Sequence, residues 1–214
     1  FGNEWIVNSQ QYFKIEVTRN GIYRISYNTL QAAGIPVSAI DPRLFQVFYL
    51  GKEQAIYVAG EQDGIFSPGD YIEFYGIRND GRTDAELFSG GAAQVNPYYS
   101  FVSDTSVYFL TWKNTGTAKR VSNYSNTAYG SFTPQPYYMH RQLIYGQYDA
   151  NFSDNAYSYG IPTYAPASIQ GSEYTTNEGY TLPWVGLGGS TTYKLPVTNY
   201  ITGVAKPVLS ATYS

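Results

Sequence analysis

The sequence predicts an all-β protein: antiparallel sheets packed as a jelly-roll-like sandwich, one short helix near residue 30, and a second, irregular β-rich portion. In the first half of the chain, short segments repeatedly alternate apolar and polar side chains, which is the two-residue period of half-buried strands. Gly, Pro, Asn and Asp separate these segments as turn residues do. No repeat of fixed period is visible, which disfavours a propeller or a solenoid.

The first expected element is a β-hairpin. Apolar residues at every second position of residues 12–18 predict a half-buried strand, and residues 22–27 supply a second one. Asn20 and Gly21 lie between them, and this pair is favoured in two-residue turns because both residues tolerate positive φ. We therefore expect the two strands to pair with each other.

A short helix is expected next, over residues 29–33. Asn28 is its predicted N-cap, and Gly34 is free to take the left-handed conformation that ends a helix. Four further strands are then expected, at residues 44–49, 55–58, 71–76 and 106–112.

Two of these strands allow more specific predictions. In residues 71–76, alternation places Ile72 and Phe74 in the core and the tyrosines on the opposite face. Residues 106–112 are continuously apolar, which favours a central position in a sheet.

Composition divides the chain into residues 1–125 and 126–214. The first part includes a Gly, Asp and Asn-rich loop over residues 78–96, expected to hold a helical turn at residues 84–88 and long enough to be a functional loop. The second part is rich in Tyr, Gly and Pro. Its expected strands are residues 137–145, 191–197 and 208–213, and because the last one reaches Ser214 without a turn signal, we expect this portion to be truncated at its C-terminal end.

Composition also limits the function. The chain has no cysteine and one histidine, which excludes thiolate catalysis and makes most metal chemistry improbable. A net charge of -3 provides no basic face for nucleic acid, and no run of eighteen apolar residues predicts a membrane span. Abundant Tyr, Asn, Ser and Thr with little Lys or Glu favours an exported protein of the periplasm, cell surface or extracellular space.

Several predicted strand and turn segments, taken in their order along the chain, resemble those of a known family. Residues 2–5, 12–25, 68–76 and 107–112 together resemble the N-terminal region of gingipain-type cysteine peptidases of Bacteroidetes. The resemblance covers residues 1–112 and is looser beyond. It implies a non-catalytic, prodomain-like or accessory region of an exported, type IX-secreted cysteine endopeptidase, serving latency, folding or substrate positioning. Its implied partner is the peptidase's catalytic domain in cis. Because the family's nucleophilic cysteine has no counterpart here, we expect no catalytic residue in this region.

An inhibitory prodomain would insert a mobile loop into the protease cleft. Four basic residues lie on predicted loops and are candidates for that role: Arg78, Arg82, Lys119 and Arg120.

Two alternatives from other functional classes remain open. The first is a surface adhesion or carbohydrate-binding module that uses aromatic loops, because Tyr and Trp offer rigid contact area with a polar tip. The second is a hydrolase with paired carboxylates, for example Glu73 with Glu178 or Asp149 with Asp154. The aromatic candidates for the first are Tyr98, Tyr99, Tyr137, Tyr138 and Trp184, although aromatic residues also pack on sheet faces.

Cofactors are not expected. His140 stands without ligand-forming neighbours at metal-binding spacing and receives no role. Calcium is the alternative, because oxygen ligands from glycine-rich turns suit it, but the spacing fits no twelve-residue calcium loop and Asp favours turns for its own reasons. The candidate residues for such a site are Asp63, Asp70, Asp80 and Asp84.

Overall fold

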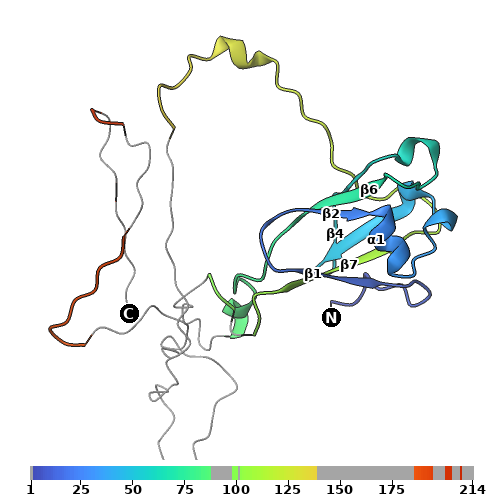
Figure 1. Ribbon diagram of the computed structural model, residues 1–214, viewed down its shortest axis with the longest axis horizontal. Helices are drawn as coiled ribbons and strands as arrows, with labels where there is room; N and C mark the ends of the chain where they lie inside the picture. Colours follow the sequence, from blue (N-terminus) through green and yellow to red (C-terminus); the bar gives the residue numbers. More distant parts are fainter. Residues whose placement is uncertain are drawn as a thin grey trace, which may run out of the picture. The chain divides into compact units, whose positions relative to one another are not determined.

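The computed structural model describes residues 2–87, 98–100, 102–138, 186–194, 201–203 and 208 (Figure 1). Its internal contacts divide the chain into two units. The first comprises Phe1–Asn79 with Ser103–Ser125, and the second comprises Asp80–Val102 with Asn126–Ser214. The predicted boundary near residue 125 stays a prediction, and each unit is described by itself.

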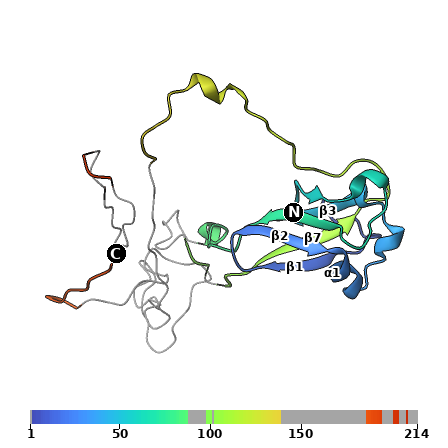
Figure 2. The ribbon, with the colours of Figure 1, turned by 45° about the horizontal axis from the view of Figure 1, so that its top comes forward.

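The first unit contains two antiparallel sheets (Figure 2). Sheet A has the strand order β1-β7-β3-β4, and sheet B has the order β2-β6-β5. The all-β prediction is confirmed, and so is the central position of residues 106–112, because β7 lies between β1 and β3. The strands are β1 (Phe13–Val17), β2 (Gly21–Ser26), β3 (Phe45–Tyr49), β4 (Lys52–Gln54), β5 (Tyr57–Val58), β6 (Tyr71–Gly76) and β7 (Ser106–Trp112).

The one α-helix in the described part of the chain, α1 (Tyr27–Ala32), begins two residues earlier than expected. Its N-cap is Ser26, whose side chain accepts a hydrogen bond from the Thr29 N–H, so the prediction of Asn28 as the cap is wrong. The C-terminal end is as expected, since Gly34 has a φ of 79°. Ser26 is the last residue of β2 and has extended backbone geometry, which is the geometry an N-cap requires.

The predicted hairpin at Asn20-Gly21 is wrong. Strand β1 pairs with β7 in sheet A, whereas β2 pairs with β6 in sheet B, so the chain crosses between sheets where the turn was expected. The Asn20 side chain accepts a hydrogen bond of 2.8 Å from the Arg78 N–H, just beyond β6. Long-range pairing with β6 and β7 has overridden the local turn preference.

A two-residue hairpin turn does occur between β3 and β4. Tyr49 pairs with Lys52, and the two residues between them, Leu50 and Gly51, both have positive φ, at 47° and 74°. Primed turns of this kind match the twist of the flanking strands. Leu50 is the only non-glycine residue with positive φ among those the structure describes.

The strain at Leu50 gives a first testable prediction. Leu50→Asn should raise the free energy of unfolding by about 0.5–1 kcal/mol, because Asn tolerates the left-handed region that a branched apolar side chain resists. Urea denaturation measures the change. Leu50 is exposed, so no core contact is lost in the exchange. An unchanged or lower unfolding free energy would show that the turn is not strained.

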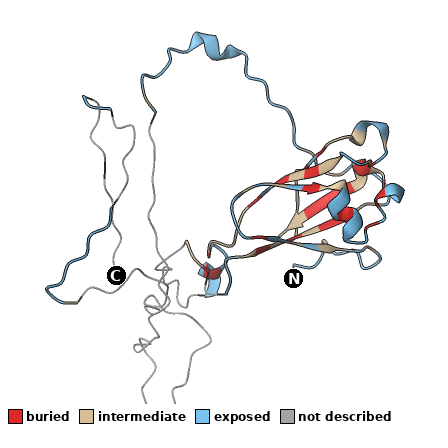
Figure 3. Cartoon of the chain, in the orientation of Figure 1, coloured by how far each residue is buried: buried red, intermediate tan, exposed pale blue. Residues whose placement is uncertain are grey.

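The inner faces of the two sheets share one hydrophobic core (Figure 3). Ile72 and Phe74 are buried, as predicted. The Phe74 ring of sheet B lies 5.1 Å from the Tyr108 ring of sheet A, measured between centroids, and the Ile77 N–H donates to the Tyr108 hydroxyl at 2.9 Å. These contacts support the sandwich, while its jelly-roll-like connectivity stays a prediction.

Gly76 lets β1 and β2 approach the end of β6. A Cβ atom on Gly76 would lie 2.7 Å from Cδ2 of Tyr23 and 3.0 Å from Cγ1 of Val17. Gly76→Ala should therefore lower the free energy of unfolding by about 1–3 kcal/mol through overpacking. Thermal and urea unfolding test it against Gly130→Ala, whose added Cβ would meet nothing within 4 Å and whose φ is not positive; equal effects of the two would contradict the steric explanation.

In its described residues the second unit contains short 3₁₀-helices and no strand. The 3₁₀-helix Asp84–Leu87 confirms the described part of the helical turn predicted at residues 84–88. Three strands were predicted in this part, at residues 137–145, 191–197 and 208–213. The described residues of these segments are 137–138, 191–194 and 208, and none of them is in a strand. The other residues of the three segments lie outside the described part of the chain. Among the described residues, the 3₁₀-helices are Val37–Ala39, Pro42–Leu44, Glu61–Asp63, Asp84–Leu87 and Ala128–Ser131.

Candidate functional site

The strongest candidate site is the face of sheet B that points away from the core. Because side chains alternate along a strand, burial of Ile25, Ile72 and Phe74 on one face places their neighbours on the other. We call this surface the sheet B outer face; it consists of Ile22, Arg24, Tyr57, Tyr71, Glu73 and Tyr75.

Apolar and aromatic side chains on this face are open to solvent. Ile22 of β2 and Tyr75 of β6 are cross-strand partners, and they are 65% and 56% exposed. Tyr57 of β5 is 45% exposed and pairs with Glu73 across the next ladder. The exposed groups therefore come from all three strands of one sheet.

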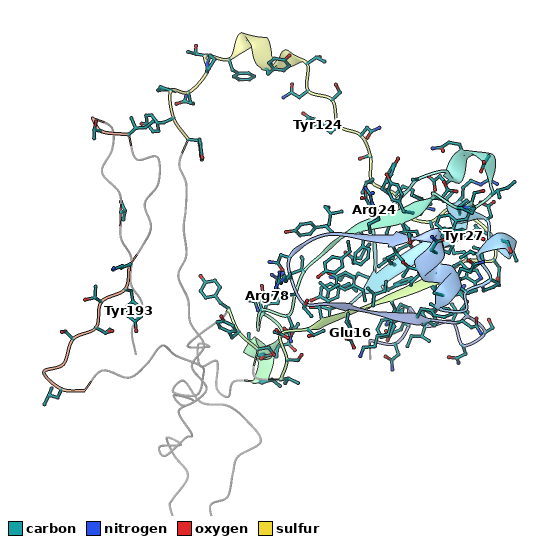
Figure 4. The ribbon with its side chains drawn as sticks, in the orientation of Figure 1. Glu16, Arg24, Tyr27, Arg78, Tyr124 and Tyr193 are labelled. Atoms are coloured by element: carbon teal, nitrogen blue, oxygen red, sulfur yellow. The ribbon has the colours of Figure 1, made fainter. Side chains whose placement is uncertain are left out.

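An ion pair lies among these apolar side chains. Arg24 Nε donates to Glu73 Oε1 at 2.8 Å, and Arg24 Nη2 lies 2.8 Å from the same oxygen. The guanidinium of Arg24, whose side chain is labelled in Figure 4, also lies 3.9 Å from the centroid of the Tyr71 ring. The Tyr71 and Tyr57 ring centroids are 6.1 Å apart. The hydrogen bond to Glu73 raises the pKa of Arg24 above its ordinary value. Arg24 and Glu73 thus neutralise each other, and the face carries no net charge.

The composition of the face suits contact with another macromolecule. Tyrosine and arginine are enriched where proteins bind one another, and a stacked, paired arginine loses less conformational freedom on binding than a free one. The sequence predicted that the tyrosines of β6 lie opposite the core. It did not single out Ile22, whose exposure depends on β2 pairing with β6 instead of β1.

Two of the four basic candidates, Arg78 and Arg82, follow β6 in the sequence. The Arg78 N–H binds Asn20, and its Nη1 donates to the Asn79 carbonyl at 3.1 Å. Arg82 is ion-paired with Asp80, with Nε 2.7 Å from Asp80 Oδ1.

The other two basic candidates, Lys119 and Arg120, belong to the first unit and bind other residues of that unit. Arg120 Nε donates to Glu61 Oε2 at 2.7 Å, while its two Nη atoms donate to the carbonyls of Phe45 and Pro42 at 3.1 and 3.0 Å. The Lys119 N–H donates to Glu53 Oε1 at 2.7 Å. Arg120 therefore tethers the segment after β7 to the sheets, and its inhibitory role remains a prediction that would require these bonds to break.

The aspartates proposed for calcium form turns and ion pairs. Asp63 Oδ1 accepts from the Ile65 N–H at 2.9 Å, and Asp70 Oδ2 accepts from the Ser67 N–H at 2.6 Å. Asp80 binds Arg82, and Asp84 is buried in the second unit. Across the described residues, no three acidic, histidine or cysteine side chains come together as metal ligands.

The aromatic candidates have different surroundings. Tyr98, Tyr99 and Tyr137 are half-buried, and Tyr138 is 82% exposed. Trp184 lies outside the described residues, as do His140 and three members of the proposed carboxylate pairs: Asp149, Asp154 and Glu178. The remaining member, Glu73, is bound to Arg24.

Comparison with known proteins adds no family: no family model, curated protein or solved structure matches the chain. The described part of the structure holds no helix that is long and apolar enough to span a membrane.

The Asp41 carboxylate gives a pH prediction. A hydrogen bond from Arg43 lowers the pKa of Asp41, so the folded state holds its proton less tightly than the unfolded state does. This stabilisation is complete above the ordinary aspartate pKa and is lost as the pH falls through the lowered folded value. We expect Asp41→Asn to flatten the decline in unfolding free energy below about pH 4. Urea titrations at pH 7 and pH 3 measure it, and parallel curves for the two proteins would contradict the prediction.

Proposed function

We propose that this chain is a non-catalytic, prodomain-like accessory region of an exported gingipain-like cysteine peptidase, and that it binds the catalytic domain through the sheet B outer face. The observation that carries the proposal is the exposed Ile22 and Tyr75 pair beside a neutralised Arg24–Glu73 ion pair. The sequence segments that resemble the gingipain family suggest that the partner is the catalytic domain of the peptidase.

The charge state of the face explains why a folded protein surface suits it. A net-neutral aromatic surface gains affinity by excluding water from apolar groups, whereas a charged ligand would have to compete with an ion pair already formed. Binding would serve latency, folding or substrate positioning. In each case the accessory region contributes contact area and no reacting group.

Calorimetric titration of the full chain against the separately produced catalytic domain tests the proposal. Ile22→Ser should weaken binding by about tenfold or more, because losing an apolar contact that becomes buried on binding costs about 1–2 kcal/mol. Ile65→Ser is the matched control, since Ile65 is 60% exposed and lies outside sheet B. Equal affinities of the two variants for the catalytic domain would show that the sheet B outer face does not bind it.

Inhibition in trans separates latency from scaffolding. If the region is inhibitory, adding the full chain should slow hydrolysis of a peptide substrate by the catalytic domain, and Arg82→Ala or Arg78→Ala should relieve the inhibition. Binding without inhibition would indicate folding or positioning instead. Retained inhibition in all four single alanine variants, at Arg78, Arg82, Lys119 and Arg120, would exclude the basic-loop mechanism.

Adhesion or carbohydrate binding is the second candidate function. The observation in its favour is the strong exposure of tyrosines after β7, namely Tyr124, Tyr129 and Tyr138. A glycan array tests it: binders lost in Tyr138→Ala would support it, and an array without binders would count against it.

A further inference from the structure

Strand β2 ends sheet B on one side with a row of unpaired backbone groups. The Tyr27 N–H, directly after β2, donates to the Asp70 carbonyl at 3.0 Å and so faces β6. Successive residues of an antiparallel strand direct their N–H and C=O groups alternately toward and away from the partner, so Ile22 and Arg24 direct theirs away from β6. These groups, which we call the β2 edge, have no partner in the part of the chain that the structure describes.

The other edge strands of the two sheets are protected against pairing with a further strand. Natural sheets protect their edges by short edge strands, by charged side chains or by cover from another segment. Strand β4 has three residues. Strand β5 has two, and residues 119–121 pair with Ile56 immediately before it. The two exposed side chains of β1 are both charged, Lys14 and Glu16.

Strand β2 has none of these protections. It is six residues long and pairs with β6 without interruption from Gly21 to Ser26, so no bulge bends it away from an incoming strand. Its Ile22 side chain is apolar and 65% exposed. Its one charged side chain, Arg24, is neutralised by Glu73 of β6 at 2.8 Å. The β2 edge is therefore open to pairing with another strand.

A second copy of the chain matches the β2 edge. Two antiparallel β2 strands related by a two-fold axis at Tyr23 would place Ile22 of each copy opposite Arg24 of the other. In that register each unpaired N–H meets an unpaired C=O, and Ile22 packs against the aliphatic stem of the opposite Arg24. Identical charges repel across a two-fold axis, but each Arg24 is neutralised within its own copy. A register centred on Arg24 would set the two guanidinium groups opposite each other and is disfavoured.

We propose that the chain forms a two-fold homodimer in which the β2 edges of two copies pair antiparallel, so that sheet B continues from one copy into the other. The two sheet B outer faces then lie on the same side of the joined sheet and stay accessible. Because strand edges bury little area, the dimer is weak and forms at high protein concentration. Its formation needs no catalytic domain and is independent of the proposed function.

Sedimentation velocity of the full chain over a series of protein concentrations tests the proposal. The mass should shift reversibly from that of the monomer to twice that value. Ile22→Pro removes an outward N–H from each copy without touching the bonds to β6, and should weaken association by about tenfold or more. Ile22→Val keeps the N–H and the β-branch and should associate as the unchanged protein does. Tyr75→Ser alters the sheet B outer face on the central strand β6 and should also leave the dimer intact.

Residue-resolved amide hydrogen exchange of the unchanged protein tests the same pairing if Ile22→Pro fails to fold. As the protein concentration rises, the amides of Ile22 and Arg24 should exchange more slowly, whereas that of Tyr23, which faces β6, should change little. A monomer at every concentration would overturn the proposal and leave the β2 edge to a strand of another protein. A dimer that Tyr75→Ser abolishes and Ile22→Pro retains would also overturn it, because the outer faces would then form the contact.

Discussion

Tyr108→Ala is expected to lower the free energy of unfolding of the first unit by about 3–5 kcal/mol. Tyr108 is almost completely buried in β7, where its ring stacks on Tyr49 at 4.3 Å and contacts Phe74 of the opposite sheet at 5.1 Å. Its removal leaves a cavity where the two sheets meet. Urea denaturation followed by near-ultraviolet circular dichroism measures the loss.

Tyr108→Phe separates the hydroxyl from the ring. The Ile77 N–H donates to this hydroxyl, so removing the hydroxyl should cost about 1–2 kcal/mol while the stacking is retained. A loss below 1 kcal/mol for Tyr108→Ala would mean that the sheets do not share this core.

Arg120→Met is expected to lower the free energy of unfolding by about 2–3 kcal/mol. The guanidinium binds Glu61 and the carbonyls of Phe45 and Pro42, and about 20% of its side chain is exposed. Methionine retains much of the apolar stem but leaves the Glu61 carboxylate without this partner. Chemical denaturation of the full chain gives the magnitude.

Two companion variants identify the cause. Adding Glu61→Gln to Arg120→Met should recover part of the loss, because the unpaired carboxylate is then removed. Lys119→Met should cost less than about 0.5 kcal/mol, since the Lys119 ammonium is 3.4 Å from a single carbonyl. If Lys119→Met and Arg120→Met have equal effects, the guanidinium is not the tether.

The alternation of apolar and polar residues predicted where the strands lie better than it predicted which strands pair with each other. Residues 71–76 and 106–112 form β6 and β7, with Ile72 and Phe74 buried, because the two-residue period directly reports a half-buried strand. Pairing depends on contacts distant in sequence. The Asn20-Gly21 signal was therefore overridden, while Leu50-Gly51, which lacks a favourable first turn residue, forms a primed turn.

The candidate site was only partly predictable for the same reason. Alternation placed the tyrosines of β6 opposite the core, but Ile22, Arg24 and Tyr57 join them only through pairing across sheet B. For Arg120, pairing distant in sequence had the opposite effect and took a residue out of the set of free loop cations. Its position in the sequence suggested a free cation on a loop, whereas it binds Glu61 and Phe45, which lie 59 and 75 residues away along the chain.

The coding sequence that follows the Ser214 codon gives the most direct test of the proposed accessory role. We predict that the reading frame continues into a domain with the His and Cys pair of a cysteine peptidase, which would supply the partner for the sheet B outer face. A frame that stops nearby, or that continues into adhesion repeats, would contradict the peptidase account and favour carbohydrate or surface binding.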